Sequence, residues 1–73
     1  MPRPEKHSLT LKGHRTSVSL EAEFWQAFCA LAEAAGQPRN ALAAEIDAAR
    51  GADEGLASAI RLYVLRALQA KGA

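Results

Sequence analysis

The hydrophobic pattern of residues 14–25, HRTSVSLEAEFW, changes period in the middle, and this change constrains the fold more than any other feature. Residues 14–20 alternate between apolar and polar, which predicts a short β-strand. From residue 21 onward, apolar residues recur at helical spacing. A lone strand leaves backbone groups unpaired along both edges and is not stable by itself. The strand therefore needs a partner.

The preceding segment 8–11, SLTL, also alternates and bears on where that partner lies. It can fold back on residues 14–20 as a hairpin. Alternatively, residues 8–20 can form one long strand, kinked at Gly13, that pairs with another chain. Lys-Gly-His is not a preferred two-residue hairpin turn, so the sequence favours pairing between chains.

The length of the chain also favours association between chains. Seventy-three residues make one domain, and chains below about 70–80 residues often need a staple or an oligomer for stability. Cys29 is the only cysteine, so no disulfide can form within the chain. His7 and His14 do not have the spacing of a zinc site, and neither a metal nor a cofactor is predicted. With 49% hydrophobic residues, a homodimer or higher oligomer is expected.

The charge is uneven along the chain. Residues 1–15 carry four basic side chains against one acidic, whereas the remainder is slightly acidic. We expect residues 1–7 to form a flexible basic arm and residues 8–73 a single domain. The arm suggests contact with a polyanion, although an ordinary solvated terminus has the same composition. With no apolar run near the ~20 residues that cross a bilayer, and no secretory signal, a cytoplasmic protein without membrane contact is expected.

Three amphipathic helices are predicted after the strand, over about residues 21–35, 39–50 and 56–70. Gly36 ends the first, and Pro38 precedes the second. The chain is thus mainly α. No catalytic triad, phosphate-binding glycine loop or acid–base pair is present, so we predict neither an enzyme nor a small-molecule substrate.

The segments RTSVSLEAEFWQAFCALAEAAG (15–36) and LASAIRLYVLRAL (56–68) resemble the ribbon-helix-helix superfamily of small bacterial and phage regulators. More narrowly, GHRTSVSLE, AEIDAARG and SAIRLYVL resemble a subgroup of unassigned role that is common in alphaproteobacteria. The resemblance covers about residues 8–68. It implies an intertwined homodimer with a two-stranded antiparallel ribbon, one strand from each chain, and one helix more than usual.

In the DNA-binding members of this superfamily the ribbon enters the major groove and the last helix begins at a phosphate. The resemblance therefore implies base contacts by Arg15, Ser17 and Ser19. It implies phosphate contacts by Lys6, Lys12, His14 and Ser58. The side chains expected in the dimer core are Thr16, Val18, Leu20, Phe24, Trp25, Phe28, Ile60, Tyr63 and Val64.

The extra helix leaves two interpretations. Residues 39–50 can be an insertion before the superfamily's last helix, or residues 56–70 can be an addition after it. We favour an insertion, because residues 56–70 have the longer apolar face.

Two functions are compatible with the sequence. The first is a dimeric DNA-binding regulator of transcription. The alternative is a dimeric protein-interaction module with the same fold that does not bind DNA specifically. Serines that discriminate bases poorly, the acidic body, and Asp53 and Glu54 near Ser58 motivate the alternative.

Overall fold

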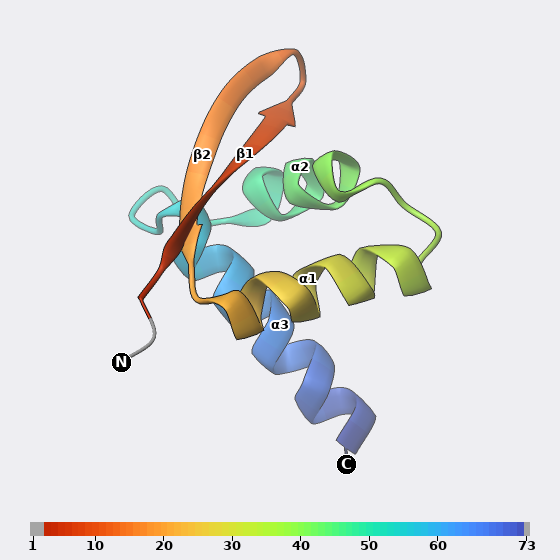
Figure 1. Ribbon diagram of the computed structural model, residues 1–73. Coiled ribbons are helices and arrows are strands. Elements are labelled where there is room, and N and C mark those ends of the chain that lie inside the picture. The colour runs from red at the N-terminus through yellow and green to blue at the C-terminus, as the bar shows by residue number, and fades with distance from the viewer. Residues whose placement is uncertain (1–2, 73) are drawn as a thin grey trace.

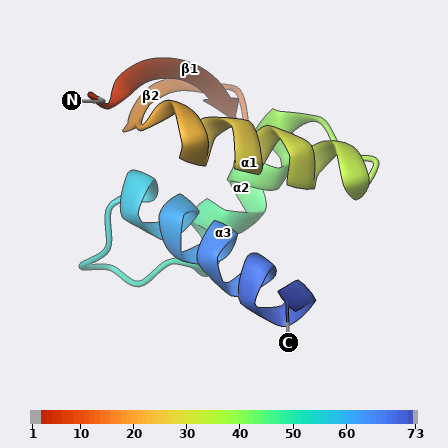
Figure 2. The same ribbon diagram turned by 60° about the horizontal axis from the view of Figure 1, so that its bottom comes forward.

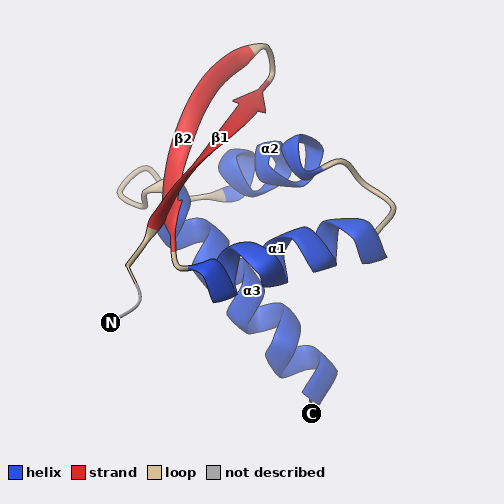
Figure 3. Ribbon diagram, in the orientation of Figure 1, coloured by secondary structure: helices blue, strands red, loops and turns tan. Residues whose placement is uncertain are grey.

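The chain folds into a β-hairpin followed by three α-helices (Figure 1), which confirms the predicted fold class of a two-stranded antiparallel sheet with three helices. The computed structural model describes residues 3–72. Figure 3 shows the hairpin lying beside the helical part of the molecule. The elements are β1 (Glu5–Leu11), β2 (His14–Leu20), α1 (Ala22–Ala34), α2 (Arg39–Ala49) and α3 (Leu56–Gly72).

The two strands pair with each other inside one chain, so the expectation that residues 8–20 pair with another chain is wrong. They are antiparallel, and Val18 lies opposite His7. The turn consists of Lys12 and Gly13, whose φ angles are 52° and 83°. Positive φ at both central residues is what a type I′ hairpin turn requires. Gly13 adopts it freely, and His14 is already part of β2 rather than of the loop.

The sheet begins earlier than the sequence suggested. Residues 5–7, predicted to belong to a flexible arm, form the first part of β1. His7 lies on the inner side of the hairpin and stacks on Trp25, with 3.9 Å between ring centroids and 5° between ring planes. The alternation of SLTL thus continues back to Glu5. Residues 1 and 2 of the expected arm lie outside the described residues.

The helices begin and end close to their predicted limits, because their local signals are strong. The backbone N–H of Gly36, at φ 68°, donates to the Glu33 carbonyl, and that of Gln37 donates to the Ala32 carbonyl. This pair of bonds is the Schellman motif, which satisfies the last carbonyls of α1. Pro38 follows as the N-cap of α2, where its missing N–H costs nothing.

One hydrophobic core joins the hairpin to all three helices. In Figure 2 the hairpin runs along one side of the molecule, with α1 next to it and α3 on the opposite side. Only one face of the hairpin contributes to the core, as alternation along a strand requires. The buried residues are Leu9, Val18, Leu20, Phe28, Ala32, Leu42, Ala43, Ile46, Ala59, Ile60 and Val64.

The side chains expected in a dimer core lie mostly in the core of the single chain. Val18, Leu20, Phe28, Ile60 and Val64 are buried there without a second chain, because β1 and α2 supply the cover that was expected from a partner. The others are half-buried or exposed: Phe24, Trp25 and Tyr63 pack against this core, and Thr16 is exposed.

Between residues 3 and 72, no helix has the length and apolar character needed to cross a membrane. Within the same residues, no three metal-ligating side chains come together at a potential metal site.

Candidate nucleic-acid interface

The hairpin has two faces of opposite character. Its inner face carries Leu9, Val18 and Leu20, which are 3%, 4% and 0% exposed. The other face, called here the outer ribbon face, comprises the remaining alternate residues of both strands, and every one of them is exposed. Its members are Lys6, Ser8, Thr10, Arg15, Ser17 and Ser19.

The strand register places these six side chains in three opposed pairs. Thr10 lies opposite Arg15 near the turn, Ser8 opposite Ser17 in the middle, and Lys6 opposite Ser19 near the base. Directly opposed side chains on one sheet face have Cβ atoms about 4.5–5.5 Å apart, so the six form a continuous surface. Two of them are basic, none is acidic, and the rest are hydroxyl groups that can donate or accept hydrogen bonds.

Arg15, Ser17 and Ser19 thus lie together on one exposed face, as expected. The second row, Lys6, Ser8 and Thr10, was not expected there, because β1 was not recognised as the other half of the ribbon. The signal was present: the alternation of SLTL continues to Lys6 with the same parity.

The residues expected at phosphates are more scattered. Lys12 lies in the turn, next to the outer ribbon face. His14 has the parity of the inner face and lines a hollow of about 330 Å³ under the hairpin tip, together with Thr16 and Arg50. Ser58 is exposed in the first turn of α3. Of the four, only Lys6 belongs to the outer ribbon face with the base-contact candidates, and Lys12 lines the same hollow as His14.

The loop before α3 is acidic. Asp53 is exposed and Glu54 is half-buried. Arg50 donates to Asp47 Oδ1 at 2.7 Å and to the backbone carbonyl of Glu54 at 2.6 Å. The Arg50 side chain is thus already bound within the protein. An anion at Ser58 would therefore lie near more negative charge than free positive charge.

Each outer edge of the hairpin is covered at one point by a helix side chain. The Thr10 backbone N–H, on the edge of β1, donates to Asn40 Oδ1 at 3.0 Å. The Ser19 carbonyl, on the edge of β2, accepts from Arg61 Nη2 at 3.3 Å. Along each strand, residues whose backbone groups point to the other strand alternate with residues whose groups point to the outer edge. The non-hydrogen-bonded pairs of the sheet are therefore Thr10–Arg15, Ser8–Ser17 and Lys6–Ser19.

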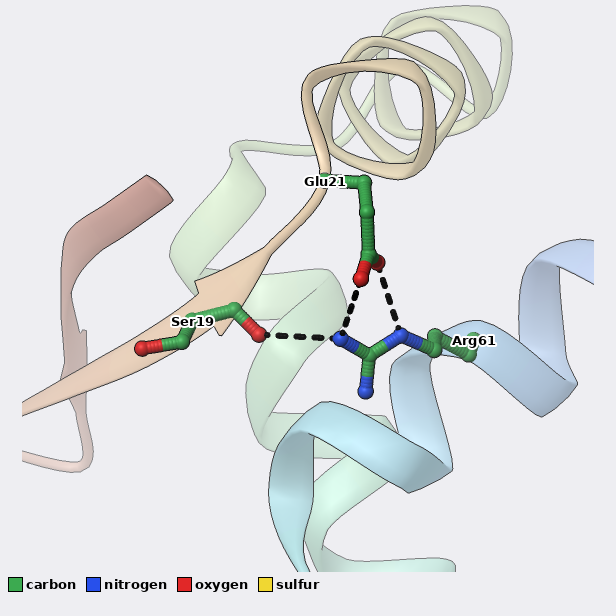
Figure 4. Close-up of polar contacts among 3 residues, drawn as sticks. All are labelled: Ser19, Glu21 and Arg61. Atoms are coloured by element: carbon green, nitrogen blue, oxygen red, sulfur yellow. Dashed lines mark hydrogen bonds and ion pairs between the residues drawn. The ribbon is translucent and has the colours of Figure 1, made fainter. Parts of the chain in front are cut away.

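Arg61 also forms an ion pair at the junction between β2 and α1 (Figure 4). Its Nε donates to Glu21 Oε1 at 2.9 Å and its Nη2 to Glu21 Oε2 at 3.2 Å. The Arg61 hydrogen bond holds the pKa of the Glu21 carboxyl below its ordinary value of 4.5; the Glu21 backbone N–H adds to this, and desolvation opposes it. A lowered folded-state pKa means that the pair stabilises the fold above pH 4.5 and loses this effect as the pH falls through the lowered value.

Neither Asn40 nor Arg61 was singled out from the sequence. The two partners of Arg61 are 40 and 42 residues away in the chain, and no local pattern relates such distant positions. Glu21 precedes α1, where any carboxylate suits the positive end of the helix, so its position alone does not indicate a distant arginine partner.

Comparison with curated proteins and with solved structures found no significant match. A family model described as a ribbon-helix-helix domain, however, matches residues 4–68. The match includes both strands of the hairpin, all of α1 and α2, and most of α3, so the additional helix lies inside the matched region. The chain belongs to the ribbon-helix-helix domain family.

Proposed function

We propose that the protein is a DNA-binding regulator of transcription whose β1–β2 hairpin enters the major groove with its outer ribbon face toward the bases. Ribbon-helix-helix domains are typically DNA-binding regulators. The observation that carries the proposal for this chain is the outer ribbon face itself: it is exposed, basic, rich in hydroxyl groups and free of acidic side chains.

The dimensions of the hairpin suit this use. Paired strands lie about 4.8 Å apart, and the major groove, about 12 Å wide, admits a ribbon of two strands. Because β1 and β2 belong to the same chain, one chain is enough to supply such a ribbon.

Within this proposal the side chains divide by chemistry. Arg15 reads a guanine, because its guanidinium can donate to O6 and N7 together. The hydroxyl groups, including Ser17 and Ser19, add hydrogen bonds of lower selectivity. Lys6, at the base of the face, and Lys12, in the turn, attract phosphates without regard to sequence. His14 and Ser58 are secondary phosphate contacts at most, given their positions. In this arrangement α3 corresponds to the superfamily's last helix, and α2 is the addition.

We further propose that two copies act together, in the cytoplasm. Family members typically form dimers that bind DNA. The exposed side chains Leu65 and Leu68, at 47% and 53%, lie on the C-terminal half of α3, and a second copy would cover them. Two copies would place two ribbons on successive half-sites, which multiplies the contacts made by one.

The alternative, an interaction module that does not read DNA, is less well supported. It would require no particular charge on the ribbon, yet the outer ribbon face carries Lys6 and Arg15 with no acidic side chain between them. Two basic side chains and no acidic one, on the element that the family typically uses for DNA, favour nucleic acid as the partner.

Retention of sequences from a pool of genomic fragments tests this function. We expect recurrent fragments to be retained at low salt, and the affinity to fall as salt rises. Lys6→Ala should weaken binding to all fragments alike and make the slope of log K against log salt shallower by about 0.9 for each phosphate that the lysine neutralises in the wild type. Lys71→Ala, in the last turn of α3, is the matched control and should leave the slope unchanged. Retention of no sequence at low salt would contradict the proposal and favour the interaction module.

A further inference from the structure

The Arg61 guanidinium holds the base of the ribbon, because it forms hydrogen bonds to the residues before and after Leu20. Arg61, on α3, donates to the carbonyl of Ser19, which is the last outer-face residue of β2. It also donates twice to Glu21, the N-cap residue from which α1 begins. Figure 4 shows Ser19 at the end of β2, Glu21 at the junction with α1 and Arg61 on α3 meeting at this point. The Arg61 guanidinium also lies 5.8 Å from the centroid of the Phe24 ring.

We propose that Arg61 is a positioning residue: with Glu21 it fixes the angle at which the β1–β2 ribbon leaves the helical body, and thereby sets the accuracy with which Arg15 meets a base. The inference rests on the DNA-binding function proposed above. It assigns Arg61 no contact with DNA.

Arg15 lies far enough from this contact that a small rotation at the base of the ribbon becomes a large displacement of Arg15. Arg15 lies four residues before Ser19 in β2, toward the turn, which is a distance of about 13 Å at about 3.3 Å per residue. A tilt of about 10° at the base would displace Arg15 by about 2 Å over that length. A hydrogen bond to a base edge tolerates a range of only about 0.5 Å in donor–acceptor distance. When the second copy holds the helical body in place, small rotations at residues 19–21 would therefore separate Arg15 from its base.

The geometry of the guanidinium suits positioning better than a single charge would. Two parallel N–H groups facing both carboxylate oxygens fix the plane of the pair, and the same Nη2 reaches the strand carbonyl. A lysine at this position would keep the charge but could not reproduce the planar fork. Both side chains are about one-third exposed, at 31% and 30%, so replacing them leaves the buried core intact.

Binding of the retained DNA and of a random fragment by four variants tests the proposal. They are Glu21→Gln, Arg61→Lys, Arg61→Met and the Glu21→Gln, Arg61→Met double variant. Each should lower the ratio of specific to non-specific affinity by about fivefold, the size expected of a partly exposed, geometrically constrained pair. The double variant should lose no more than the single variants, because the residues act as one unit. The salt slope should not change, and Arg66→Met, an exposed arginine on the same helix, should match the wild type.

Glu21→Gln is the most informative variant, because it removes a negative charge. Simple electrostatics would make it bind both DNAs more tightly, so a loss of affinity for the specific DNA points to geometry. If Arg61 instead contacted a phosphate, Arg61→Met would make the salt slope shallower by about 0.9, Arg61→Lys would bind normally, and Glu21→Gln would bind as well as wild type. That pattern, or unchanged specificity in all variants, would overturn the proposal.

A second readout separates this inference from the proposed function. Amide hydrogen exchange of Thr16, Val18 and Leu20, which face β1, reports how firmly the ribbon is held, with or without DNA. We expect faster exchange in Glu21→Gln and Arg61→Met than in Arg66→Met. If the wild type retains no DNA sequence, the proposed function fails. Equal exchange in all variants would show that the pair does not hold the ribbon, whatever the DNA result.

Discussion

Replacing Arg15 by alanine is expected to abolish sequence-specific DNA binding while leaving the fold intact. Arg15 is exposed, lies opposite Thr10 and is the only arginine on the outer ribbon face. A bidentate arginine–guanine contact contributes about 1–3 kcal/mol of discrimination, a factor of roughly 5 to 150 in affinity. No other side chain of that face can form the same planar pair of hydrogen bonds, so the loss would not be compensated.

Titration of the retained DNA and of a random fragment with each variant measures this effect. Arg15→Lys keeps the charge but not the planar fork, so it should bind random DNA like the wild type and still lose specificity. Arg66→Ala, which removes an exposed arginine from α3, should have no effect on specificity. If Arg15→Ala keeps the wild-type ratio of specific to non-specific affinity, the outer ribbon face is not the reading surface.

Phe28→Ala is expected to lower the free energy of unfolding by about 3–5 kcal/mol, the usual cost of deleting a buried aromatic ring. Phe28 is 0% exposed, and its ring packs 5.6 Å from that of Trp25. For a chain of 73 residues, at about 0.05–0.15 kcal/mol per residue, the whole stability is about 4–11 kcal/mol. The variant should therefore lose about a quarter or more of its stability, and at the low end of this range it should be unfolded.

Urea unfolding followed by the fluorescence of Trp25, the single tryptophan, gives the comparison with wild type. Gln26→Ala is the matched control, because this side chain on the same helix is exposed and its truncation should change stability by less than about 0.5 kcal/mol. A Phe28→Ala variant as stable as the Gln26→Ala control would mean that the core differs from the one described.

The predictable parts of this fold are those with strong local signals. Gly36 and Pro38 bracket the connection from α1 to α2, and the helix limits differ from expectation by one or two residues. The inner parity of Val18 and Leu20 followed from alternation alone. The exposure of Arg15, Ser17 and Ser19 on one face followed from the same alternation.

The hairpin was missed for a local reason. A type I′ turn favours residues that adopt positive φ easily, and Lys12 is not one of them. Burial of Leu9 and stacking of His7 on Trp25 offset the cost of that turn, and both contacts involve residues far apart in the sequence. Period-two patterns show that a strand exists, but they do not identify the strand it pairs with.

The contacts that position the ribbon were equally inaccessible from the sequence. Asn40 and Arg61 each bond the hairpin from a helix 30 to 42 residues away in the chain. Both belong to helix faces that also carry apolar residues, and nothing in their local spacing distinguishes them from solvated side chains. Only the packing of the three helices against the hairpin brings them to its edges.

A single chain closes the ribbon, and a disulfide between its two strands tests this pairing. Ser8 and Ser17 are opposed in a non-hydrogen-bonded pair, where Cα atoms lie about 4.5 Å apart, within the range that a disulfide spans. Both would be replaced by cysteine in a Cys29→Ala background, with each single-cysteine variant as a control. The chain would be oxidised at low micromolar concentration and its mass measured without reductant. We predict a crosslinked species near 7.8 kDa, the mass of one chain. A species that crosslinks only as a covalent dimer would contradict the account, because the strand facing Ser17 would then come from another molecule.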